Sequence, residues 1–102
     1  GKGAAISKYT GARGKSGSND ANAEYLGILR KAFDDAKVEY QTAELGRIDA
    51  GGGGTIAYIP AAYGMDVIDI GVPILNMHAP YEVSSKADVY ETTKCYKAFY
   101  EM

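Results

Sequence analysis

Three stretches of the chain have the hydrophobic pattern of β-strands. Residues 4–9 form a short strand-like segment, and residues 38–45 alternate loosely between polar and β-favouring apolar positions. Residues 66–72 form an apolar run of the kind that fills a strand buried on both faces. We therefore predict three strands, with the third in the middle of a sheet.

Helical spacing of apolar residues predicts a long helix between the first two strands. Ser18, Asn19 and Asp20 are all favourable N-caps, so this helix is expected to start among them. It should cover one side of the sheet with a single apolar stripe. The stripe consists of Ala21, Tyr25, Ile28, Leu29, Ala32, Phe33 and Ala36.

Two further helices are predicted. A short buried helix should follow Thr55, kinked or confined by Pro60 and stopped near Gly64. The last helix should occupy residues 85–102, where Ser85 and Asp88 resemble a capping box. Its apolar face is expected to contain Val89, Thr92, Tyr96, Phe99 and Tyr100.

Strands and helices thus alternate along the whole chain. Alternation at this spacing is typical of an α/β fold, with a mostly parallel sheet and helices packed on its faces. A chain of 102 residues is expected to form one domain, residues 1–102.

Composition excludes several classes of protein. A net charge of −2 argues against a broad nucleic-acid surface, which needs clustered Lys and Arg. No run approaches the roughly 18 apolar residues of a membrane span, so no membrane partner is expected. Cys95 is the single cysteine, which favours a cytoplasmic location and, with one histidine, excludes a Cys/His zinc cluster.

A polar turn after Pro73 carries His78, the single histidine. Loops that leave sheet strands are where α/β proteins usually place their chemistry. The imidazole could be a metal ligand, a general base or an idle surface group. A catalytic metal needs about three protein ligands, and the chain offers one imidazole with scattered carboxylates such as Glu82.

Four consecutive glycines at positions 51–54 separate a predicted strand from a predicted helix. They either cradle a carboxylate, carbonyl oxygen or phosphate with backbone amides, or form a tight turn. The run matches neither the phosphate-binding nor the dinucleotide-binding glycine motif. Asp49 either stabilises this turn or contacts a substrate amine. Lys8, Arg13 and Lys15 are either solvated charges or a clamp for a substrate carboxylate.

Three segments together resemble one known family: residues 8–24, 42–59 and 66–88, of which the last reads DVIDIGVPILNMHAPYEVSSKAD. They are similar to the C-terminal part of the aspartyl aminopeptidase and aminopeptidase I family of cocatalytic zinc metallopeptidases. The resemblance covers nearly the whole chain, in the same order.

The resemblance implies a fold, a cofactor and a site. The fold would be part of a three-layer α/β/α sandwich. Two metal ions, usually zinc, would be bound, and His78 falls on the family's last metal ligand, in its Met-His-Ala/Ser motif. Lys8 falls on a lysine near the substrate pocket. The loop that lines the substrate cleft falls on Gly52, Gly53, Gly54 and Thr55.

The activity implied is hydrolysis of the N-terminal residue of peptides by a water that two zinc ions activate. Family members are homo-oligomers that assemble into dodecamers. The other metal ligands and the glutamate base lie in motifs that this sequence lacks, so no catalytic residue is assigned here. The chain is therefore expected to be a fragment, inactive alone. The alternatives are a stand-alone α/β module that binds an anionic ligand at its glycine-rich loop, or an assembly domain without a site.

Overall fold

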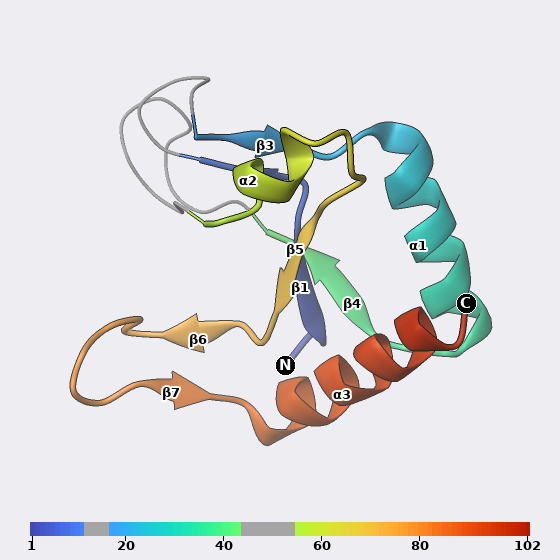
Figure 1. The fold of residues 1–102 in the computed structure, drawn as a ribbon. Coiled ribbons are helices and arrows are strands. Elements are labelled where there is room, and N and C mark those ends of the chain that lie inside the picture. The colour runs from blue at the N-terminus through green and yellow to red at the C-terminus, as the bar shows by residue number, and fades with distance from the viewer. Residues whose placement is uncertain (12–16, 44–54) are drawn as a thin grey trace. The chain divides into compact units, whose positions relative to one another are not determined.

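The computed structural model has the α/β fold that the alternation of elements predicts (Figure 1). The described residues are 1–11, 17–43 and 55–102. The chain divides into two compact units. The first unit comprises Gly1–Ala5, Leu29–Gln41 and Ile70–Met102, and the second comprises Ile6–Ile28 and Thr42–Asp69.

Three strands form a sheet in the order β4-β1-β5. Their bounds are Ala4–Ser7 for β1, Tyr40–Thr42 for β4 and Asp69–Gly71 for β5. The Ala4 N–H donates to the Glu39 carbonyl at 3.1 Å, and the Ala43 N–H donates to the Ile6 carbonyl at 2.8 Å. Both partners advance together along the chain, so β1 and β4 run parallel.

The prediction that residues 66–72 fill the middle of the sheet is wrong. β5 is shorter, lies at one end of the strand order, and has only half-buried residues. The middle position belongs to β1, in which Ala4 and Ile6 are 0% and 1% exposed. An apolar run shows that side chains avoid water, but it does not show which strands flank them.

Helix α1 spans Ala23–Asp35 and buries Leu29 and Phe33 of the predicted stripe. The stripe is wrong at Ile28, which is 55% exposed, and at Ala36, which is exposed and follows the end of the helix. The helix starts later than expected, because the Tyr25 N–H donates to the Asn22 side-chain oxygen at 2.7 Å and makes Asn22 the cap. Two of the expected cap residues instead form β3 (Asn19–Asp20), which pairs antiparallel with β2 (Tyr9–Thr10).

Helix α2 (Tyr58–Ala61) is short, as Pro60 predicts, and Gly64 follows it with a φ of +81°. The expectation that this helix is buried is wrong, because none of its residues is buried and the preceding Ile56 is 77% exposed. A helix of one turn has too little surface to bury a continuous stripe.

Helix α3 (Lys86–Tyr100) belongs to the first unit. Among the residues of the predicted apolar face, Thr92 alone is buried. The other buried residues of the helix are Asp88, Cys95 and Ala98. Ser85 makes no side-chain cap bond, so the predicted capping box is also wrong. Asp88 instead accepts the Gly3 N–H at 2.9 Å. Helical periodicity does not predict a hydrogen bond to a residue so far away in the sequence.

The polar turn after Pro73 is a β-hairpin. Strands β6 (Ile74–Leu75) and β7 (Val83–Ser84) pair antiparallel with each other, with Leu75 opposite Val83. Residues 76–82 form the loop that joins them. Across the described ranges, no helix is long and apolar enough to span a bilayer.

Candidate functional site

His78 lies in the exposed loop of the β6–β7 hairpin. Its backbone N–H donates to the Glu82 carboxylate, across the loop. The Ala79 N–H donates to the Asn76 carbonyl at 2.9 Å and closes a turn around His78. Two hydrogen bonds thus fix the backbone of the histidine, while its ring remains exposed to solvent.

This loop has an unusual backbone conformation. His78 has a φ of 68° and Asn76 a φ of 60°, in the left-handed region that residues with a Cβ seldom adopt. Such conformations cost on the order of 1–3 kcal/mol each and persist where surrounding contacts enforce them. At His78 the Glu82 carboxylate supplies such a contact, because it accepts the backbone N–H of this residue.

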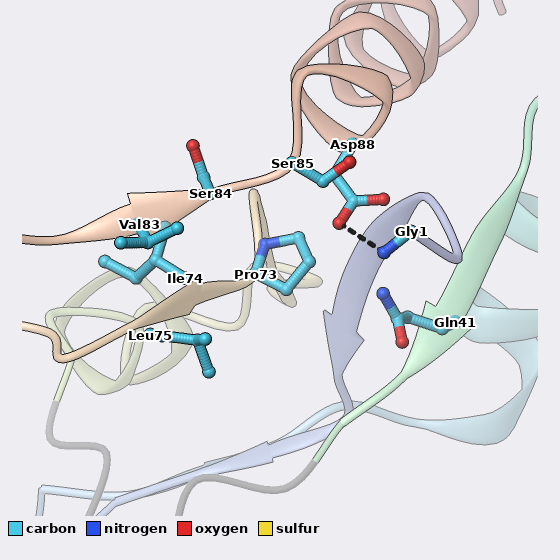
Figure 2. A pocket seen from close by; sticks show the side chains of 9 residues that line it. All are labelled: Gly1, Gln41, Pro73, Ile74, Leu75, Val83, Ser84, Ser85 and Asp88. Carbon is cyan, nitrogen blue, oxygen red and sulfur yellow. Dashed lines mark hydrogen bonds and ion pairs between the residues drawn. The ribbon is translucent and has the colours of Figure 1, made fainter.

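A pocket of about 450 Å³ in the first unit lies beside the hairpin (Figure 2). Its apolar wall is formed by hairpin residues, and Asp88 lies at its other side. The Asp88 carboxylate is already occupied, because it accepts the Gly1 amine and the Gly3 N–H, each at 2.9 Å. The Gly1 amine makes the larger contribution to lowering the pKa of Asp88, and the Gly3 N–H lowers it further. Among the site residues that the structure describes, Lys8, Thr55 and His78, none lines this pocket.

Thr55, the residue that follows the glycine run, belongs to a polar cluster in the second unit. Its hydroxyl donates to the Asp69 carboxylate at 3.1 Å, and the Thr10 hydroxyl donates to the same oxygen at 2.7 Å. Thr10 is 2% exposed. The cluster joins β2, β5 and the start of the segment leading to α2.

Lys8 also lies in the second unit, between β1 and β2. Its ammonium forms an ion pair with Asp20 of β3, and the side chains are 42% and 60% exposed. Exposed pairs of this kind contribute at most about 1 kcal/mol. The Lys8 ammonium can therefore exchange Asp20 for another anion at little cost.

The predicted site residues fall into three groups. Lys8 and Thr55 lie in the second unit, and His78 lies in the first. Gly52, Gly53 and Gly54, like Asp49, Arg13 and Lys15, lie outside the described residues.

The side chains that could bind a metal ion decide whether the chain can hold one alone. Within residues 1–11, 17–43 and 55–102, no group of three or more His, Cys, Asp or Glu side chains could hold a metal ion. His78 with its neighbour Glu82 offers donors of the right chemical type for zinc. His78 and Glu82 therefore have the chemistry to contribute to a zinc site, but other residues would have to supply the remaining ligands.

Sequence reasoning missed Asp69 and Thr10. A signal for Asp69 was present, because its carboxylate interrupts the otherwise apolar run Val67-Ile68-Asp69-Ile70. A charge in such a run needs a partner in the fold. Thr10 carries no comparable signal, since threonine is common in strands.

Comparison with known families identifies the class. A family model described as aminopeptidase I zinc metalloprotease (M18) matches residues 1–100. The chain therefore belongs to the M18 family of aminopeptidases, a zinc metalloprotease family.

Two curated relatives show how close the similarity is. The probable M18 family aminopeptidase 1 of Clostridium acetobutylicum is 65% identical over 99 residues, which is 97% of this chain and 21% of the relative. Its counterpart in Thermotoga maritima is 52% identical over 101 residues, which is 99% of this chain and 22% of the relative. The chain thus spans about a fifth of the length of these relatives.

Solved structures share the fold of this chain. The crystal structure of aminopeptidase I from Clostridium acetobutylicum has a TM-score of 0.88, covering 97% of this chain and 22% of that protein. The aminopeptidase of Thermotoga maritima has a TM-score of 0.85, with 94% and 21% covered. The strands and helices described above are therefore those of an M18 aminopeptidase.

Proposed function

We propose that this chain forms the C-terminal part of the catalytic domain of an aminopeptidase that removes the N-terminal residue from peptides and uses two zinc ions. The family match over residues 1–100 carries this proposal. The remaining four-fifths of a complete enzyme, judged by the length of the relatives, would supply the other metal ligands and the general base. The isolated chain would be inactive.

His78 would be the metal ligand of this segment. The residue is exposed, so its imidazole is accessible to a metal ion, and two hydrogen bonds in the loop hold the backbone that carries it. An imidazole nitrogen is a common zinc ligand. Zinc, when bound, would polarise the scissile carbonyl and lower the pKa of a water molecule.

The other predicted residues would bind the peptide. The Lys8 ammonium can pair with a carboxylate of the substrate, because its ion pair with Asp20 is exposed. Thr55 directly follows Gly52, Gly53 and Gly54 in the sequence. The backbone amides of these glycines would hold a carbonyl or the backbone of the substrate. Peptide substrates, a cytoplasmic location and a dodecameric homo-oligomer complete the proposal.

A hybrid enzyme tests the proposal. The matched segment of the Clostridium acetobutylicum relative is exchanged for this chain, and aminopeptidase activity and bound zinc are measured. We expect an active hybrid, and His78→Gln should lower both zinc content and activity, the latter by more than about a hundredfold. The control is Tyr81→Phe, since Tyr81 lies in the same loop and is 86% exposed.

A His78→Gln hybrid that keeps its full zinc content and activity would contradict the role given to this residue. Calorimetric titration of the isolated chain with zinc provides a second check. Weak or no binding is expected, because the described residues supply too few ligands. Tight stoichiometric binding would argue that the chain holds a complete metal site of its own.

A further inference from the structure

Hydrogen bonds join Asp69, Thr10 and Thr55 into one cluster. One oxygen of the Asp69 carboxylate accepts from Thr10 at 2.7 Å and from Thr55 at 3.1 Å. A carboxylate oxygen can only accept, so the two threonine hydroxyls are the donors in these bonds. The two hydroxyl oxygens lie 3.2 Å apart, and either could donate to the other. Asp69 acts here as a charged acceptor, and such bonds are about twice as strong as neutral ones.

The Thr55 hydroxyl is held from both sides. It donates to Asp69 and accepts the Ala57 N–H at 3.2 Å. Its orientation therefore fixes the backbone over residues 55–57, directly after the glycine run. Thr10 anchors the same carboxylate from β2, a strand 45 residues earlier than Thr55. Three separate segments of the second unit thus meet at one oxygen atom.

We propose that Asp69 is a positioning residue, which holds Thr55, and with it the backbone of residues 55–57, in place before a peptide binds at Thr55. This inference rests on the proposed function only in assigning a substrate to Thr55. Rigid placement of a binding group lowers the cost of ordering it when the ligand binds. Loss of the carboxylate should therefore weaken peptide binding more than it slows the chemical step.

The first test needs no enzymatic activity. Amide exchange at Ala57 is measured by NMR in the 102-residue chain and its variants. Asp69→Asn and Thr55→Val should each accelerate exchange by about tenfold, and Thr55→Ser, which keeps the hydroxyl, should do so less. The control is Asp66→Asn, the same change at an acid whose side chain contacts Asn22 instead. Equal exchange in Asp69→Asn, Thr55→Val and Asp66→Asn would overturn the proposal.

The second test uses the hybrid enzyme. Asp69→Asn and Thr55→Val should raise KM for a peptide by about tenfold, with kcat within about threefold and zinc content unchanged. Asp66→Asn should leave both constants within about twofold. Unchanged KM in an active hybrid would overturn the role of Asp69 in substrate binding. An inactive parent hybrid would instead count against the proposed function, and the exchange measurement would still decide whether Asp69 positions Thr55.

Discussion

Gly3 and Gly27 should respond in opposite directions to the same substitution. Gly3 has a φ of +89°, and a Cβ there would lie 2.0 Å from the Glu39 carbonyl oxygen and 2.3 Å from its carbon. Real Cβ atoms do not approach backbone so closely, so the pairing of β1 with β4 must shift. Gly27 lies within α1, has no atom within 4 Å of an added Cβ, and has an ordinary φ.

The magnitude for Gly3→Ala follows from three losses. A left-handed alanine costs about 1–2 kcal/mol. Displacing the Glu39 backbone breaks its bond from the Ala4 N–H, and moving Gly3 breaks the bond from Gln41 to the Gly3 carbonyl. Each of these is worth about 1 kcal/mol. The free energy of unfolding should fall by about 3 kcal/mol, a large share of the roughly 5–15 kcal/mol of a typical domain.

Gly27→Ala should instead stabilise the chain by about 0.5–1 kcal/mol, because alanine favours a helix interior and reduces the entropy of the unfolded state. Urea denaturation followed by circular dichroism measures both variants against the parent chain. A loss below about 0.5 kcal/mol for Gly3→Ala, or equal effects of the two substitutions, would refute the reasoning.

Three further predictions concern the first unit. The hydrogen bond from the Glu39 N–H, and to a smaller extent Lys94, lowers the pKa of the Glu91 carboxyl group. Ionised Glu91 therefore stabilises the fold above the ordinary carboxyl pKa, and this stabilisation is lost as the pH falls through the lowered value. Glu91→Gln should make the free energy of unfolding less sensitive to acid. Burial raises the pKa of Cys95 to about 11, so a thiol reagent at pH 8 should modify it only after unfolding, and rapid modification of the native chain would contradict this. Phe33 is 0% exposed, so Phe33→Ala should cost about 3–5 kcal/mol in the same urea assay, and a cost below about 1 kcal/mol would show that the site is not packed.

The roles of the site residues stay predictions. The family motifs placed His78, Lys8 and Thr55 in the sequence, but the hydrogen bond from His78 to Glu82 and the left-handed backbone at His78 are tertiary facts. Asp69 was missed because its partners lie far away in the chain, with Thr10 at a separation of 59 residues. No local pattern encodes such a separation.

The amino-acid sequence alone determined the alternation of strands and helices, the burial of Leu29 and Phe33 on α1, and the family. These features depend on local periodicity and on motifs read in order. Only the tertiary structure decided that β1 is the middle strand, that α2 is exposed and that Asp88 faces inward on α3. Those outcomes depend on which distant segment covers each face, and the apolar or polar character of a residue does not specify its neighbour.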